Sequence, residues 1–380
     1  MKSLFRSSSS SSTVIGNDID IFTQILLCLS VKPLLVFKSV SKQWYSVISD
    51  PIFIKKHTQR QYPHSVMVET ETNNPKFEFV SLDGSSSFVP FETLDFFSDL
   101  IIKIKQSCNG LLCCFSYEDY GNCTYYICNP STKQYRRIVD FGFDMAKEKG
   151  FVMPLSVSLA YEPLKSRHYK VICVWMMPLE QSTPRLRACQ IEIYSSETDS
   201  WKLSGDVFFV SYSITNKSGV YCNGSLHWID SSKLENHICF NIDQELRTGM
   251  PPYRSLLYSE KRSNVEYFGE CRGRLHLISD CVLESIYDIL EMKTDYTGWI
   301  KKFRVNVREF PYPVVSGGFC VLHVEEVGES FMLVLRIRDQ VISCNLREMS
   351  FKDLYKFAPL TWEKISQDSS YQYIETLAFV

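Results

Sequence analysis

The sequence lacks the short motifs that identify most catalytic and nucleotide-binding sites. It contains no Gly-rich phosphate-binding loop, no His-Glu-x-x-His pair and no Gly-x-Ser-x-Gly nucleophile turn. A single Ser-x-x-Lys match, Ser39 to Lys42, lies in a segment with helical periodicity, and four-residue matches of this kind are common by chance. We therefore expect no catalytic residues, no metal ligands and no cofactor, and a chain that is not an enzyme.

Positive charge and long apolar runs are also missing. The net charge of −2 gives no surplus to neutralise phosphates, which argues against nucleic acid as a general partner. No apolar stretch approaches the roughly 20 residues needed to cross a membrane. Residues 1–16 lack the apolar core of a signal peptide. We expect no membrane partner, and a location in the cytoplasm, the nucleus or both.

Cysteine is abundant, but its spacing excludes the usual metal and disulfide frameworks. The chain has 14 cysteines and no Cys-x-x-Cys motif. Most of them lie within apolar runs, where a free thiol behaves as a small hydrophobic side chain. The sequence therefore predicts reduced cysteines in a protein core.

Helical periodicity is confined to residues 17–57, after a Ser-rich tail at residues 1–16 that we expect to be disordered. Phe22, Ile25, Leu26 and Leu29 fall on one helical face. Pro33 suits the first turn of a second helix. Ser41 is a candidate cap for a third helix, and Asp50-Pro51 is a candidate start for a fourth.

This module of about forty residues is too small to bury its many large apolar side chains on itself. We therefore expect a second protein to cover part of it. Between residues 31 and 61, six basic side chains accompany Asp50 as the one acidic residue. These side chains are either an ordinary solvated face or a surface that attracts an acidic partner.

From residue 65 onward, after a predicted linker at 58–64, short β-type runs alternate with turn residues. The predicted strands are Ser65–Glu69, Lys76–Leu82, Leu111–Tyr117, Tyr125–Asn129, Ser156–Tyr161, Tyr169–Met176, Cys189–Ser195, Val220–Asp230, Ile238–Ile242, Arg274–Ser279, Ser285–Met292, Phe331–Ile337 and Gln340–Leu346.

A degenerate repeat of about fifty residues favours a β-propeller for residues 65–380. Its recognisable part is a turn followed by an apolar strand, as in Asn109 to Leu112, Asn223 to Trp228 and Arg272 to Leu277. Fifty residues suit one four-stranded blade, so we expect about six blades, with seven as the alternative. The overall fold class is thus α+β and multidomain. We expect the ring to close through a C-terminal strand, Glu375–Phe379, paired near residues 65–105.

His227 and His276 follow equivalent turns of this repeat. Either both are buried strand histidines bonded to backbone groups, which we favour, or they form a metal or catalytic pair. The tryptophans of the region are expected to pack between blades, and these are Trp175, Trp201, Trp228, Trp299 and Trp362.

The helical module resembles an F-box, in the form found in large plant families that carry an F-box-associated, kelch-like propeller domain behind it. The matching residues are Asp20 to Phe22, Ile25-Leu26, Leu29, Val31-Lys32, Leu34-Leu35, the run Phe37 to Trp44, Ile48 to Pro51, Phe53 and His57. The Leu-Pro pair that usually opens the motif is missing, and Gln24 and Ser30 replace a common Glu and Pro. Ser107 to Leu111, Asn129 to Thr132 and Tyr373 to Leu377 resemble the associated domain.

This resemblance implies the substrate-recognition subunit of an SCF-type cullin–RING ubiquitin ligase. The helical module would dock on a Skp-type adaptor, and through it on the cullin and RING subunits, while the β domain captures a protein target. The expected adaptor-binding residues are Ile25, Leu26, Leu29, Pro33, Leu34, Val40 and Trp44. The substrate-binding residues and the target stay unknown. The alternatives are an interaction scaffold outside ubiquitination, and a propeller that either binds a small molecule or glycan or is a hydrolase with its site built from loops.

Overall fold

A computed structural model of the chain describes most of the helical and β regions. The described residues are 20–60, 65–69, 76–82, 91, 93–97, 100–117, 123–138, 153–177, 186–211, 214, 217–230, 237–259, 263–281, 284–312, 319–357 and 370–380. The predicted tail at 1–16 lies outside them.

The N-terminal region is helical, as the periodicity predicts. Residues 20–27 are helical and are followed by α2 (Val31–Phe37), α3 (Lys42–Ser49) and α4 (Pro51–Arg60). Ser41 caps α3, because its Oγ accepts a hydrogen bond from the N–H of Trp44 at 3.2 Å. Asp50 caps α4 by accepting from the N–H groups of Ile52 and Phe53 at 2.7 and 3.2 Å. The last helix thus continues past the expected boundary at His57 into the predicted linker, whose residues 61–64 lie outside the described residues.

No helix in the described part of the chain is both long enough and apolar enough to span a bilayer.

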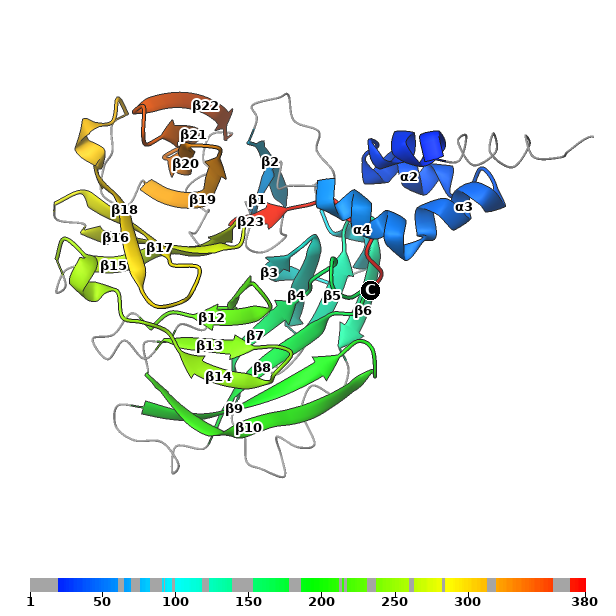
Figure 1. Cartoon of the computed structure of the whole chain (residues 1–380), viewed down its shortest axis with the longest axis horizontal. Coiled ribbons are helices and arrows are strands. Elements are labelled where there is room, and N and C mark those ends of the chain that lie inside the picture. The colour runs from blue at the N-terminus through cyan, green and yellow to red at the C-terminus, as the bar shows by residue number, and fades with distance from the viewer. Residues whose placement is uncertain are drawn as a thin grey trace, which may run out of the picture.

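The β region is a ring of six antiparallel sheets, and this confirms the predicted six-bladed propeller (Figure 1). The first sheet contains β3 (Lys103–Cys108), β4 (Leu111–Tyr117), β5 (Cys123–Asn129) and β6 (Gln134–Ile138). The second sheet contains β7 (Met153–Ala160), β8 (Lys170–Met176), β9 (Leu186–Ser195) and β10 (Ser200–Ser211). The third sheet contains β11 (Val220–Cys222), β12 (Ser225–Trp228), β13 (Ile238–Asn241) and β14 (Leu246–Gly249). The fourth sheet contains β15 (Ser263–Cys271), β16 (Arg274–Cys281), β17 (Ile286–Met292) and β18 (Trp299–Asn306). The fifth sheet contains β19 (Phe319–Val327), β20 (Ser330–Ile337), β21 (Gln340–Asn345) and β22 (Ser350–Lys356). The sixth sheet contains β1 (Ser65–Glu69), β2 (Phe77–Ser81) and β23 (Ser370–Tyr373). Short 3₁₀ helices occupy Asp95–Phe97, Arg254–Leu256 and Val307–Glu309.

The sixth sheet joins the two ends of the β region. In it, β23 is antiparallel to β1, with Ser65 opposite Tyr373 and Val68 opposite Ser370. The predicted closing strand, Glu375–Phe379, was therefore placed too late in the chain, because the pairing ends at Tyr373. Beyond it, the Asn129 side-chain amide donates to the carbonyls of Thr376 and Ala378 at 2.9 and 2.8 Å, which holds the terminal segment on the first sheet without strand pairing.

The repeated turns have the backbone conformation that their sequences require. Asn109-Gly110, Asn223-Gly224 and Arg272-Gly273 connect the inner strand of a sheet to its second strand, and both residues of each pair have positive φ. This is the conformation of a type I′ hairpin turn, which matches the twist of the flanking strands. The prediction of one continuous strand at Val220–Asp230 was wrong, because the Asn223-Gly224 turn divides this segment into β11 and β12.

Two glycines of these turns form a matched pair for testing the contact between the first sheet and the segment that follows β23. A Cβ on Gly110 would lie 2.6 Å from Thr376 Cγ2 and 2.8 Å from the Ile374 carbonyl oxygen, whereas a Cβ on Gly224 would meet no atom within 4 Å. We predict that Gly224→Ala costs about 1 kcal/mol in unfolding free energy, from backbone strain alone. Gly110→Ala should cost at least about 2 kcal/mol more, because the terminal segment must move. Urea unfolding of both variants measures the difference, and equal losses would contradict this contact.

Candidate functional sites

The helical module has its own apolar core. Its fully buried side chains come from all four helices and from the C-terminal segment, and they are Leu26, Leu27, Val31, Leu34, Ile48, Phe53 and Leu377. His57 is also buried, and its Nε2 lies 2.8 Å from the Leu29 carbonyl oxygen. The core is therefore completed by a residue from the far end of the chain.

The C-terminal segment fixes the module to the ring. The N–H of Val31, at the start of α2, donates to Glu375 Oε2 at 2.9 Å. Two residues later, Leu377 enters the module core with only 2% of its surface exposed. Figure 1 shows the C-terminus next to α4, between the helices and the first sheet. The segment that follows the closing strand thus holds both bodies together.

The seven expected adaptor-binding residues fall into three groups. Ile25 and Val40 are exposed, and Leu29, Pro33 and Trp44 are half-buried. Leu26 and Leu34 are 1% and 0% exposed, so in this structure they stabilise the module from within. Trp44 packs on Phe22 and Phe37, with ring centroids 4.7 and 4.9 Å apart.

The module also exposes large apolar side chains that the periodicity argument did not select. Ile21, Val36, Tyr45 and Ile52 join Ile25 and Val40 in exposing 57–64% of their surfaces. A soluble domain usually limits such exposure, and apolar side chains concentrated on one small unit mark an interaction surface. We call these six residues the exposed apolar set.

A cavity of about 1110 Å³ occupies the middle of the ring. Its walls come from β3, β11, β15, β19 and β23, together with the segment that precedes β11. The Gln106 side chain closes the wall beside β7, because its Nε2 donates to the carbonyls of Leu159 and Gly219 at 3.2 and 3.0 Å. Its Oε1 accepts from the N–H of Leu159 at 2.6 Å. One amide therefore links the first three sheets at the cavity wall.

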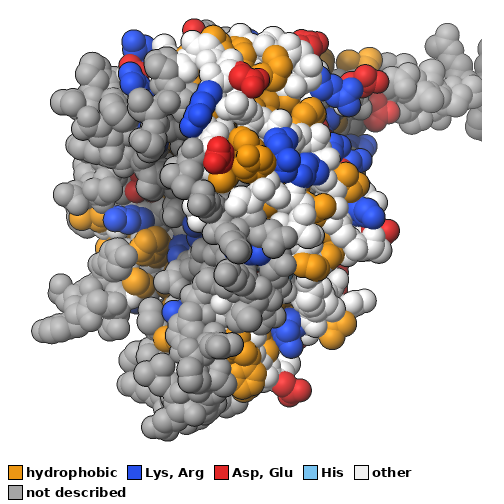
Figure 2. All heavy atoms as spheres, turned by 90° about the vertical axis from the view of Figure 1, so that its left-hand side faces the viewer, with side chains coloured by type: hydrophobic (Ala, Val, Ile, Leu, Met, Phe, Trp, Pro, Cys, Tyr) orange, Lys and Arg blue, Asp and Glu red, His pale blue; other side chains and the backbone are white. Residues whose placement is uncertain are grey.

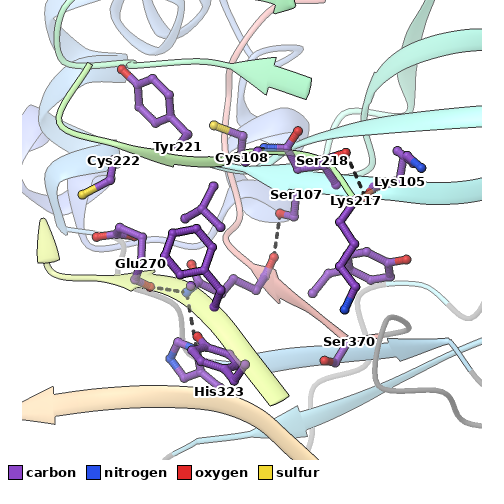
Figure 3. A pocket seen from close by; sticks show the side chains of 18 of the residues that line it. Lys105, Ser107, Cys108, Lys217, Ser218, Tyr221, Cys222, Glu270, His323 and Ser370 are labelled. Carbon is purple, nitrogen blue, oxygen red and sulfur yellow. Dashed lines mark hydrogen bonds between the residues drawn. The ribbon is translucent and has the colours of Figure 1, made fainter. Parts of the chain in front are cut away.

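The polar groups of the cavity are separated along its length (Figure 3). Lys105 and Lys217 lie toward one end, and Glu270, Tyr221 and Cys222 lie toward the other. The Tyr221 hydroxyl donates to Glu162 Oε2 at 3.3 Å, which adds a second carboxylate to this end. The lining thus carries charged groups of both signs, since Arg187 and Glu266 also belong to it.

Burial suppresses the reactive groups of this cavity. It raises the pKa of Cys108 and of Cys222 to about 12, so both thiols stay protonated at neutral pH. Burial also lowers the pKa of His323 to about 4, so its imidazole is neutral. The Nδ1 of His323 lies 3.4 Å from Gln372 Nε2, which donates to the Glu270 carbonyl oxygen at 2.9 Å. These groups are suited to binding by hydrogen bonds and charge, and less to nucleophilic attack.

The two repeated histidines differ in their surroundings. His227 matches the expectation, since its Nδ1 lies 3.2 Å from the Val220 carbonyl oxygen and its Nε2 lies 3.5 Å from Cys239 Sγ. The expectation was wrong for His276, which has no backbone partner and faces two carboxylates instead. Sequence spacing could not reveal this, because the carboxylates come from other strands.

The cysteines and tryptophans of the described region have the predicted structural roles. None of the 14 cysteines forms a disulfide in the structure, and most are buried. Trp175, Trp228 and Trp299 are buried in the cores between sheets, while Trp201 is partly buried against one of them and Trp362 lies outside the described residues.

The face of the ring opposite the helical module has mixed charge. Figure 2 shows Lys and Arg side chains interspersed with Asp, Glu and apolar groups over its described part. The described residues of this face thus form no broad basic surface of the kind that nucleic acids bind.

Comparison with known proteins matches both parts of the chain. The family model described as "F-box associated beta propeller domain" matches residues 56–327, and the one described as "F-box domain" matches residues 18–56. The F-box protein At5g07610 of Arabidopsis thaliana is 27% identical and covers 98% of this chain and 93% of its own length. The F-box/kelch-repeat protein At3g23880 of the same plant is 24% identical over 80% of this chain and 84% of its own. A chain in the crystal structure of a nidogen/laminin complex is 12% identical, with a TM-score of 0.43 over 82% of this chain and 97% of its own.

The contact between the C-terminal segment and the module can be tested with two neighbouring residues. Leu377→Ala should remove about 2–5 kcal/mol of stability, because it leaves a cavity in the module core. Phe379→Ala should cost about 1 kcal/mol or less, since this side chain is 50% exposed. Hydrogen exchange of the amides in α2 and α3 measures the local effect. Equal protection of these helices in both variants would contradict a shared core.

Proposed function

Because this chain belongs to the family of F-box proteins that carry an F-box associated β-propeller domain, we propose that it is the substrate-recognition subunit of an SCF-type cullin–RING ubiquitin ligase. In this role the helical module binds a Skp-type adaptor, and through it the cullin and RING subunits. The propeller captures a target protein. The proposal places the chain in the cytoplasm, the nucleus or both.

The exposed apolar set is the observation that carries this proposal. Six large apolar side chains on a module of four short helices stay in water unless a second protein covers them. The match to an F-box supports a Skp-type adaptor as that protein. Ile25 and Val40 are the expected contact residues that are already at the surface, and the half-buried Leu29, Pro33 and Trp44 can join them at its edge. Leu26 and Leu34 would act by holding the helices that present these side chains.

Basic side chains on the same module support an acidic partner. Lys32, Lys42, Lys55 and Lys56 are exposed, and Asp50 is the one acidic residue among positions 31–60. Complementary charge accelerates association and excludes wrong partners more than it strengthens the final complex. Binding should therefore slow as the salt concentration rises.

The chain would contribute proximity to the ligase. A target held by the propeller is brought close to a ubiquitin-conjugating enzyme, so its lysines reach a high effective concentration there. The contact between Leu377 and the module core supports this role, because it limits the movement of the propeller relative to the helices. No bond needs to be made or broken by the chain itself.

The central cavity supports a second candidate function, the binding of a small molecule or glycan by the ring. Its volume of about 1110 Å³ is larger, and its charged lining is more polar, than packing requires. This function is compatible with adaptor docking, since the cavity and the exposed apolar set involve different residues. Loss of target binding on blocking the cavity, with adaptor binding intact, would assign the cavity to target capture.

Adaptor docking is tested by placing charge in the exposed apolar set. The double variant Ile25→Glu, Val40→Glu should weaken binding of a purified Skp-type adaptor at least about 30-fold, because two apolar contacts become buried charges. Both side chains are exposed, so the fold should be retained. Binding is measured by biolayer interferometry on the full chain.

The matched control carries the same charges on the ring. Leu246 and Ile300 are 54% and 42% exposed and lie on β14 and β18. Leu246→Glu, Ile300→Glu should bind the adaptor like the unmodified chain. Undiminished adaptor binding by the module variant, or an equal loss in both variants, would refute the proposed docking surface.

A further inference from the structure

Three ligand-type side chains that do not line the central cavity meet between the fourth and fifth sheets. His276 comes from β16, Glu291 from β17 and Glu326 from β19. The Nε2 atom of His276 lies 3.5 Å from Glu291 Oε2 and 3.9 Å from Glu326 Oε1. The histidine and Glu291 are buried, while the side chain of Glu326 is 20% exposed.

The fully buried His276 ring is unusual because, among the described residues, only these two carboxylates lie within ion-pair distance of it, and neither nitrogen makes a hydrogen bond of good geometry. The Oε2 atom of Glu291, which faces the ring, forms an ion pair with Lys302 Nζ at 3.0 Å. Buried polar atoms nearly always have a partner, and an exception calls for a missing water, ion or ligand. The equivalent His227 in the preceding sheet is bonded on its Nδ1 side to the chain itself. The position in the repeat therefore does not explain the unpartnered ring.

The donor atoms are spaced as a small metal ion requires. Metal–nitrogen and metal–oxygen bonds of about 2.1 Å in a tetrahedral site place neighbouring donors about 3.4 Å apart. The two separations from His276 Nε2, 3.5 and 3.9 Å, lie within about half an ångström of this value, and all three donor atoms lie within 4.8 Å of one another. One imidazole and two carboxylates are a donor set that suits zinc and related divalent ions.

We propose that His276, Glu291 and Glu326 form a binding site for a divalent transition-metal ion of the zinc type, which links the fourth and fifth sheets. The two carboxylates carry two negative charges, of which Arg274 balances one, and the ion would balance the other in place of Lys302. Arg274 occupies the other oxygen of Glu291, with its Nη1 2.8 Å from Oε1, and so leaves Oε2 directed at the site.

Lys302 occupies the site when no metal is bound. Its Nζ lies 3.0 Å from Glu291 Oε2 and 3.8 Å from Glu326 Oε1. The lysine side chain is 30% exposed on β18, so it can turn toward solvent when the ion enters. The metal ion and the Lys302 ammonium group would thus compete for the same pair of carboxylates.

This competition gives the proposal a test in which a variant gains affinity. The full chain is stripped of metal with a chelator and titrated with zinc chloride by calorimetry. We expect one zinc ion per chain and a rise of about 3 °C or more in Tm at saturating zinc. Glu326→Gln should lower the zinc affinity at least tenfold, and Lys302→Met should raise it at least threefold. Misfolding cannot produce the second result.

Glu329→Gln is the matched control, because this carboxylate lies three residues after Glu326 and is 94% exposed. It should leave zinc binding unchanged. Cobalt substitution separates this site from the free cysteines, since a site without sulfur ligands gives no thiolate charge-transfer absorption. Three results would each overturn the site: no saturable binding by the unmodified and Lys302→Met chains, equal affinity in the Glu326→Gln and Glu329→Gln chains, or thiolate absorption from the bound cobalt.

Discussion

The pairing of β23 with β1 is the interaction on which the rest of the structure depends. It brings residues 370–373 beside residues 65–68 and so closes a ring from sheets that are otherwise made of consecutive strands. An open ring would leave β1 as an unpaired edge, which invites aggregation. The residues that follow β23 then reach the helical module through Glu375 and Leu377. Eleven C-terminal residues thus determine both the closure of the ring and the placement of the helices.

Sequence reasoning found the middle strands of the sheets and missed most of the others. Strands such as β4, β8, β16 and β20 are buried on both faces and appear in the sequence as apolar runs. Outer strands such as β14 are exposed along their whole length and carry no such signal. Inner strands such as β3 line the polar cavity, so their alternation is weak. A propeller therefore reveals its repeat and blade count more readily than the strands that form its cavity.

The same limit applies to the candidate sites. Helical periodicity selects the stripe that faces a core, and this is why Leu26 and Leu34 were grouped with Ile25 although both complete the module core. Ile21, Val36, Tyr45 and Ile52 lie off that stripe and were missed. His276 could not be separated from His227, because Glu291 reaches it through the pairing of β16 with β17 and Glu326 comes from the next sheet. The family and the general role were predictable, whereas the side chains at the surface and around the cavity depend on the fold.

The central claim is that one C-terminal segment performs two separable tasks, closing the ring at residues 370–373 and completing the helical core at residues 375–377. Hydrogen exchange on two shortened chains tests it most directly. A chain that ends at Tyr373 should keep the amides of β1 protected and lose protection in α2 and α3. A chain that ends before Ser370 should lose both. Protected β1 amides in the shorter chain, or fully protected helices in the longer one, would contradict the account.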